Sequence, residues 1–240
     1  MKSSWTILAE TDNWVAVNKP AGLLSVPDRE QTEPSLKDLL QEKYGFVRTV
    51  HRLDKPTSGL ILFARNETAH QYLSQLFEHR KIEKIYLGLV LGAPVKTSQT
   101  IDVPIQENPA KTATYITSAK GKPAQTSYQL LHSYGRYSWM RFELHTGRTH
   151  QIRVHLKHIG HPLAGDEIYG NGEPLLLSSI KGKKFKLSID EESERPLLNR
   201  LALHAFQLKF KDSDGTDIAL EAPLPKELNA ALKQLEKWSK

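Results

Sequence analysis

The chain has 240 residues, no cysteine, and 33 lysine and arginine residues against 27 aspartate and glutamate residues, a net charge of +6. The missing cysteines exclude disulfides, thiolate nucleophiles and cysteine-bound zinc, and they fit a reducing cytoplasm. No apolar run reaches 18 residues and no signal-peptide region opens the chain, so no membrane contact is expected, while the positive excess favours a polyanionic partner such as nucleic acid.

The first part of the chain predicts short apolar strands and amphipathic helices in alternation. A strand is expected over residues 14–17, because four apolar residues are followed by a Pro- and Gly-containing turn. A helix is expected over residues 35–44, since Ser35 and Asp38 resemble a capping box. Asn66 is expected to cap a second helix.

The stretch from His51 to Ala64 combines reactive side chains with a buried strand. It begins His-Arg-Leu-Asp-Lys, turns through Pro56–Gly59 and runs into five apolar residues, Leu60–Ala64. A carboxylate on a turn that leads into a core strand is held rigidly and can still face a cleft. Taken alone, however, Asp54 is more often a turn residue whose side chain bonds nearby backbone.

The later elements are expected in an irregular order. They are a buried strand over residues 85–91, β structure over 113–145, a helix over 149–159, a charged loop over 172–195, a strand over 201–210, and a final helix opened by Pro225. This pattern predicts one α+β domain over residues 1–240 with a mixed, mostly antiparallel sheet. No G-x-G-x-x-G, G-x-x-x-x-G-K or G-x-S-x-G motif is present, which argues against nucleotide-cofactor enzymes and serine hydrolases.

A second polar region, residues 143–162, holds five histidines, two arginines and a lysine. Gln151, His155 and His158 share one face of the expected helix, and Arg148 and Arg153 lie on the loop and first turn. With the amides of the helix N-terminus, they predict a phosphate-gripping surface. A zinc site is disfavoured, because no H-E-x-x-H occurs and no carboxylate falls within the helix.

A third feature is the segment Gly165–Gly170, which contains two carboxylates. Asp54 paired with Asp166 or Glu167 is a candidate for the two-carboxylate site of a glycosidase. The sequence does not place these residues within reach of each other, so this remains an alternative.

These motifs, in this order, resemble the signature of the RluA-type RNA pseudouridine synthases. The resemblance covers residues 5–235, and the joint pattern is specific although each piece is not. The matching segments are His51–Asp54, Thr57–Leu60, Lys84–Tyr86, Thr146–His155, Gly160–Pro162, Gly165–Asp166, Tyr169–Gly170, Leu203–Ala205 and Ala222–Pro225.

The resemblance implies roles for individual residues. Asp54 is then the nucleophile, Tyr86 packs against the target base, and Arg153 forms an ion pair with Asp54. Arg52 helps to displace the target nucleotide. RNA contacts are expected from Arg52 and from the following residues: His51, Arg148, His150, Gln151, His155, Lys183 and Lys184.

The resemblance also implies a fold, a reaction and a partner. The fold is a single pseudouridine-synthase-like catalytic domain, with helices and loops flanking the sheet around a central cleft. The reaction isomerises uridines in ribosomal or transfer RNA without a cofactor or a metal. We expect a cytoplasmic monomer with no obligatory protein partner. The alternative is an RNA-binding protein with a vestigial catalytic site.

RNA selection is expected to rest on the catalytic domain. Family members that modify ribosomal RNA often carry a small S4-like RNA-binding domain at the N-terminus, and we expect none here. The candidate phosphate contacts are lysines spread along the chain, namely Lys19, Lys111, Lys120, Lys122 and the cluster from Lys181 to Lys186.

Overall fold

The computed structural model describes residues 5–28, 30–186 and 193–239. The chain divides into two compact units, each assembled from segments that are distant in the sequence. The first unit comprises residues 1–86, 143–146 and 204–223, and the second comprises residues 87–142, 147–203 and 224–240. One domain over residues 1–240, with a central cleft, therefore stays a prediction.

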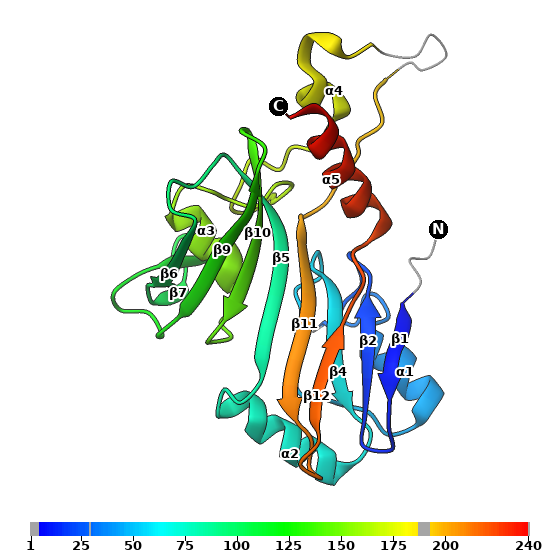
Figure 1. The fold of residues 1–240 in the computed structure, drawn as a ribbon. Helices are drawn as coiled ribbons and strands as arrows, with labels where there is room; N and C mark the ends of the chain where they lie inside the picture. Colours follow the sequence, from blue (N-terminus) through cyan, green and yellow to red (C-terminus); the bar gives the residue numbers. More distant parts are fainter. Residues whose placement is uncertain (1–4, 29, 187–192, 240) are drawn as a thin grey trace. The chain divides into compact units, whose positions relative to one another are not determined.

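The elements of the two units are labelled in Figure 1. The first unit contains β1 (Thr6–Glu10), β2 (Trp14–Lys19), α1 (Leu36–Tyr44), β3 (Arg48–Thr49), β4 (Ser58–Ala64), α2 (Glu67–Glu78), most of β11 (Leu203–Lys211) and β12 (Asp217–Glu221). The second contains β6 (Ser98–Asp102), β7 (Ile105–Glu107), β8 (Tyr115–Thr117), β9 (Gln125–Ser133), α3 (Gln151–His158), α4 (Leu177–Lys181), the 3-10 helix η1 (Gly182–Lys184) and α5 (Lys226–Trp238). The chain passes between the units within β5 (Glu83–Leu91) and β10 (Tyr137–Leu144).

In the first unit, the strands follow the order β1-β2-β4-β11, with β12 beside β11 and β3 beside β4 (Figure 1). β2 runs antiparallel to β4, with Trp14 opposite Ala64 and Asn18 opposite Leu60. β4 and β11 are parallel, whereas β1–β2, β3–β4 and β11–β12 are antiparallel. The sheet is therefore mixed and mostly antiparallel.

The core of the first unit forms on β4, the strand that follows Asp54. All seven residues of β4 are buried, so both of its faces are covered. On one face, Leu60 and Leu62 pack with Trp14 of β2, Leu73 of α2 and Phe210 of β11. A strand that is buried on both faces has a continuous apolar sequence. The apolar run over residues 60–64 therefore predicted this strand.

The two helix caps predicted from the sequence are both present. Ser35 and Asp38 form a complete capping box at the start of α1. The Asn66 side chain accepts a hydrogen bond from the Ala69 amide at 2.8 Å and so caps α2. Short-range capping patterns are visible in the sequence because all of their partners lie within three residues.

The second unit contains the antiparallel pair β6–β9 and the separate antiparallel hairpin β7–β8. Val154 of α3 lies in a small core with Ile105, Ala124 and Tyr169, and Tyr115 of β8 packs against it. The α3 helix is thus fastened to β7 and β8 by apolar contacts.

The α+β fold with a mixed, mostly antiparallel sheet is confirmed, with two local corrections. The helix expected over residues 149–159 begins at Gln151, and His150, in the left-handed conformation with φ of 56°, precedes it. The segment expected as a loop over residues 172–195 contains α4 and η1, and residues 187–192 lie outside the described part. Among the described helices, none combines the length and apolar composition that a membrane crossing requires.

Candidate active site

Asp54 lies in a turn whose backbone is held on both sides. The Ser25 hydroxyl donates to the Leu53 carbonyl oxygen at 2.8 Å, and the Leu53 amide donates to the Ser25 hydroxyl oxygen at 3.1 Å. The Thr57 amide donates to the Asp54 carbonyl oxygen at 3.0 Å. Leu53 and Thr57 are buried, whereas Asp54 between them is half-buried. A rigid backbone therefore supports a carboxylate that is in part accessible.

The buried ammonium group of Lys19 anchors the same turn. Lys19 has no exposed surface, although its side chain is charged. Its Nζ donates to the carbonyl oxygens of Pro20 at 3.0 Å, Leu23 at 2.8 Å and Lys55 at 3.2 Å. The prediction that Lys19 contacts RNA phosphate is wrong, because the ammonium points inward to the residue that follows Asp54.

The end of the turn is fixed against β11. Ser58 lies opposite His204, and Gly59 opposite Ala205, in parallel register. The His204 Nε2 atom donates to the Ala222 carbonyl oxygen at 3.2 Å, so its Nδ1 accepts from the Ser58 hydroxyl at 3.0 Å. Gly59 has φ of 114°, and a Cβ there would lie 2.2 Å from the Ala205 oxygen. Only glycine allows this close approach.

Tyr86 is buried on β5, and its hydroxyl is close enough to Asp54 to respond to its charge. Burial raises the pKa of the Tyr86 phenol, and the Asp54 carboxylate raises that pKa further. Tyr86 therefore keeps its proton at neutral pH and presents a neutral hydroxyl and a planar ring. The first unit thus brings together two of the three residues predicted to be catalytic.

The two residues before the Asp54 turn have different environments. His51 Nε2 accepts a hydrogen bond from the Leu62 amide at 2.9 Å, and its ring stacks on Phe77 with centroids 4.5 Å apart. Burial, and then the charge of Lys84, lowers the pKa of His51 to about 3, so the ring is neutral. Arg52 is exposed. The geometry gives His51 a supporting role in the fold, and its contact with RNA stays a prediction.

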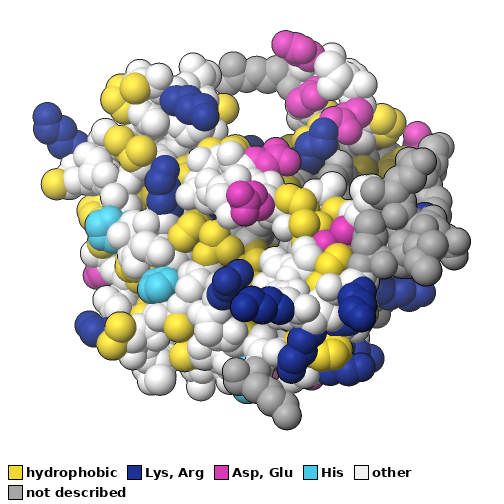
Figure 2. Space-filling model, turned by 90° about the horizontal axis from the view of Figure 1, so that it is seen from above, with side chains coloured by type: hydrophobic (Ala, Val, Ile, Leu, Met, Phe, Trp, Pro, Cys, Tyr) yellow, Lys and Arg dark blue, Asp and Glu magenta, His cyan; other side chains and the backbone are white. Residues whose placement is uncertain are grey.

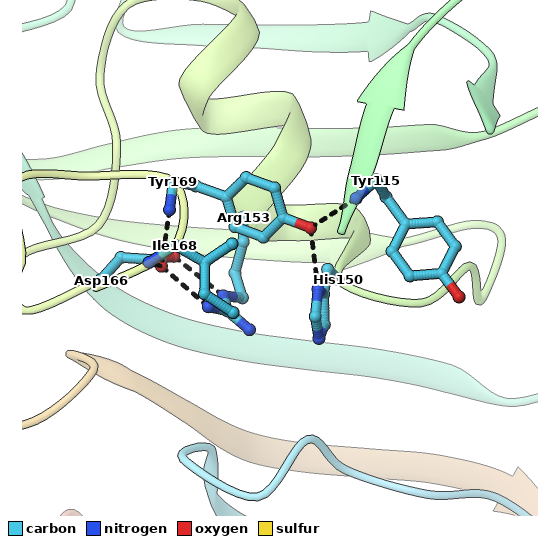
Figure 3. Close-up of polar contacts among 6 residues, drawn as sticks. All are labelled: Tyr115, His150, Arg153, Asp166, Ile168 and Tyr169. Carbon is cyan, nitrogen blue, oxygen red and sulfur yellow. Dashed lines mark hydrogen bonds and ion pairs between the residues drawn. The ribbon is translucent and has the colours of Figure 1, made fainter. Parts of the chain in front are cut away.

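Arg153 is held in the second unit by a bidentate ion pair with Asp166 (Figure 3). Its Nε and Nη2 atoms each donate to one Asp166 oxygen at 2.8 Å. The two side chains are 4% and 0% exposed, respectively. Burial disfavours the ionised carboxyl, but the hydrogen bonds and charge of Arg153 outweigh it and hold the pKa of Asp166 below its usual value. The pairing of Arg153 with Asp54 stays a prediction.

This ion pair weakens the two-carboxylate interpretation. Asp166 is ionised and already accepts hydrogen bonds from Arg153 and from the amides of Ile168 and Tyr169, so it is unsuited to act as a general acid. Glu167 is exposed. Among the residues that the structure describes, no group of three His, Asp or Glu side chains is arranged to hold a metal ion.

Two of the predicted RNA contacts on α3 are buried supports of the helix. The Gln151 side chain donates to the Gln125 carbonyl and the Thr126 hydroxyl, both at 2.9 Å. His155 has no exposed surface, and its ring nitrogens contact the Thr126 hydroxyl at 3.0 Å and the Val103 carbonyl at 2.9 Å. These side chains hold α3 against its neighbours and do not form a surface for RNA.

The remaining predicted contacts are more accessible. Arg148 is half-buried and donates through Nε to the Pro123 carbonyl at 3.0 Å. His150, also half-buried, contacts the Tyr169 hydroxyl through Nδ1 at 2.8 Å. Lys183 and Lys184 of η1 are exposed. Figure 2 shows that several Lys and Arg side chains gather in the lower half of the view, whereas most Asp and Glu side chains lie in its upper half.

Comparisons with known proteins identify the family of this chain. The sequence model of RNA pseudouridylate synthase matches residues 13–158, which contain Asp54, Tyr86 and Arg153. The chain belongs to the RNA pseudouridylate synthase family. It is therefore an isomerase that converts uridine to pseudouridine in RNA, and the resemblance to RluA-type synthases is confirmed.

Several members of this family align with most of the chain. The dual-specificity RNA pseudouridine synthase RluA of Vibrio vulnificus is 38% identical over 214 residues, covering 86% of this chain and 78% of the relative. The ribosomal large subunit pseudouridine synthase D of Nitrosomonas europaea is 36% identical, covering 95% of this chain and 64% of the relative. The structure of human RNA pseudouridylate synthase domain containing 1 has a TM-score of 0.72 at 27% identity, covering 95% of this chain and 87% of that chain.

Two residues of the site escaped the sequence-based reasoning. Lys19 was expected at the surface, and Asp166 was considered only as a hydrolytic acid. The signal for Lys19 was its place directly before the Pro20–Gly22 turn, where carbonyl oxygens lack strand partners. The signal for Asp166 was the glycine before it, which lets a carboxylate turn back onto its own loop.

Proposed function

We propose that the protein isomerises specific uridines of ribosomal or transfer RNA, with Asp54 as the nucleophile. The observation that carries this proposal is the Asp54 turn itself. An accessible carboxylate stands on a backbone fixed by Ser25 and Lys19, and its charge reaches the buried hydroxyl of Tyr86. The family's reaction needs a carboxylate of this kind next to a planar aromatic surface.

In the proposed reaction, a carboxylate oxygen of Asp54 attacks C1′ of the target uridine. The N1–C1′ bond breaks, and its electron pair leaves with the uracil. The uracil then rotates, C5 forms a bond to C1′, and the carboxylate departs with the electrons of the C–O bond. C5 loses its hydrogen as a proton and N1 gains one, so the overall composition is unchanged and no cofactor is required.

The other residues have supporting roles in the same proposal. Tyr86 supplies a neutral ring for stacking on the uracil. Arg153 forms an ion pair with the Asp54 carboxylate through its planar guanidinium group. Exposed Arg52 fills the space left when the target nucleotide is taken out of its stack. A cytoplasmic monomer is part of the proposal, since the enzyme must reach into folded RNA.

The names of two relatives support part of this choice of RNA. One is named as a dual-specificity RNA pseudouridine synthase and another as a ribosomal large subunit synthase. Ribosomal RNA, which the second name indicates, and transfer RNA, which the sequence-based expectation includes, are the substrates to test first. Mapping pseudouridines in both RNA classes from cells with and without the gene would identify the position.

The decisive assay follows tritium released from RNA labelled at uridine C5. Wild type should release tritium into water, and Asp54→Ala should lower the rate by about 10³-fold or more, because the nucleophile is removed. Asp12→Ala, at an exposed aspartate between β1 and β2, is the matched control and should leave the rate unchanged.

Two other results would contradict the proposal. Undiminished release by Asp54→Ala would remove Asp54 from the chemistry. Tight RNA binding by wild type with no release from either RNA class would favour a binding protein with a vestigial site.

A further inference from the structure

Asp166 and Tyr169 hold the Arg153 guanidinium group in place, and we call these two residues the clamp. A guanidinium group has five N–H donors in one plane, and Asp166 receives two of them along one edge, from Nε and Nη2. Two parallel bonds fix the plane and the rotation of the guanidinium, whereas a single bond would fix neither. The directions of the remaining N–H groups are then set by the same pair of bonds.

Asp166 is itself held rigidly by its own loop. One of its carboxylate oxygens accepts from the Ile168 and Tyr169 amides, both at 3.0 Å. Its carbonyl oxygen accepts from the Gly170 amide at 2.9 Å. The residue before it, Gly165, has φ of 68°, and a Cβ there would lie 2.2 Å from the Arg200 oxygen. These contacts restrict the backbone conformation of the loop, and they fix the position of the Asp166 carboxylate.

The Tyr169 ring packs against the face of the Arg153 guanidinium group (Figure 3). Its ring centroid lies 4.9 Å from the Arg153 Cζ atom. The Tyr169 oxygen accepts from the Tyr115 amide at 2.9 Å and contacts His150 Nδ1 at 2.8 Å. The ring is thus tied to β8 and to the start of α3, and Arg153 is fixed along one edge and one face.

We propose that Asp166 is a positioning residue for the isomerisation: it orients the Arg153 guanidinium without touching the RNA or the reacting atoms. This inference rests on the proposed function, in which Arg153 acts beside Asp54.

Asp166→Asn is the direct test. The amide keeps the size of the carboxylate but turns an N–H group toward the guanidinium, so the two parallel hydrogen bonds cannot both form. Since a displacement of about 1 Å at a reacting group costs up to about 10²-fold in rate, kcat for tritium release should fall by about 10- to 100-fold. KM should change by less than about 3-fold, because the bulk of the RNA-binding surface remains. Glu167→Gln, the exposed neighbour, is the matched control.

A second pair of variants addresses the chance that Asp166→Asn fails to fold. Arg153→Ala removes the guanidinium and should be rescued in part by low millimolar guanidinium ion, which Asp166 can bind in its place. Arg153→Ala with Asp166→Asn carries no lone buried charge and should show no rescue. A merely structural role for Asp166 would not produce a rescue that depends on it.

The outcomes separate this inference from the proposed function. Loss of activity in Asp54→Ala together with unchanged kcat in folded Asp166→Asn would overturn the clamp and leave the proposed function intact. Equal rescue with and without Asp166 would overturn it as well. Full activity in Asp54→Ala would instead overturn the proposed function.

Discussion

Replacing Lys19 with methionine removes the buried ammonium group that holds the Asp54 turn. Methionine fills a similar volume but donates no hydrogen bond. Three carbonyl oxygens then lack a charged donor, including that of Lys55, the residue after Asp54. The variant therefore tests whether the turn depends on this ammonium group.

The size of the effect follows from two opposing contributions. A hydrogen bond to a charged group contributes about 1.5–3 kcal/mol, so three such bonds contribute about 4.5–9 kcal/mol. Returning the ammonium to water offsets several kcal/mol of this, which leaves a net destabilisation of about 3 kcal/mol. In a chain of this length, that destabilisation lowers Tm by about 6–12 °C.

Activity should fall with stability in this variant. Release of the Lys55 carbonyl lets the Asp54 turn move, and a movement of about 1 Å costs up to about 10²-fold in rate. Thermal unfolding and tritium release are measured on the same preparations, with activity assayed well below the lowered Tm.

Lys55→Met is the matched control. It removes an exposed ammonium one residue from Asp54, together with its surface ion pair with Glu33, and keeps the carbonyl that Lys19 binds. Its effect on stability should stay within about 0.5 kcal/mol. If Lys19→Met melts and turns over like wild type, the buried ammonium does not hold the turn.

Two further predictions concern pH and salt. The pKa of His51 is about 3 in the folded protein and 6.5 in an unperturbed histidine. The free energy of unfolding is therefore insensitive to His51 above pH 6.5. As the pH falls from 6.5 toward 3, it decreases by at most about 1.4 kcal/mol per pH unit, because only the unfolded chain binds the proton. Denaturant titrations of wild type and His51→Gln should differ by this slope, and parallel curves would contradict the buried neutral ring. Lys183→Glu with Lys184→Glu should reduce the salt slope of RNA binding by about 0.7 for each phosphate that the protein no longer neutralises, with exposed Lys233→Glu as control. An unaltered slope would show that Lys183 and Lys184 of η1 do not contact RNA phosphates.

The features predicted correctly from the sequence depend on neighbours along the chain. The caps at Ser35 and Asn66 were visible because their partners lie three residues away. The β4 strand was visible because burial on both faces leaves an unbroken apolar run. Asp54 was singled out by its position on the turn before that run and by the resemblance to RluA-type synthases, and its catalytic role stays a prediction.

The features that were missed depend on residues far apart in the sequence. Lys19 was assigned to the surface although two of its acceptors are nearby, because the third, the Lys55 carbonyl, lies 36 residues later. His155 was assigned to an RNA-binding face by helical periodicity, which cannot show that Val103 and Thr126 cover that face. A histidine or lysine in a basic segment has the same one-letter pattern whether it faces solvent or backbone.

The close approach of Gly59 to Ala205 has a consequence for how the protein is made. Ser58 and Gly59 are synthesised early, but the strand that fixes them carries His204 and Ala205, 146 residues later. Contacts of such long sequence separation form late, because the intervening chain must first be closed into a loop. As the ribosome extends the chain, the end of the Asp54 turn lacks this support until β11 has emerged, and the N-terminal segment alone leaves the β11 side of β4 open.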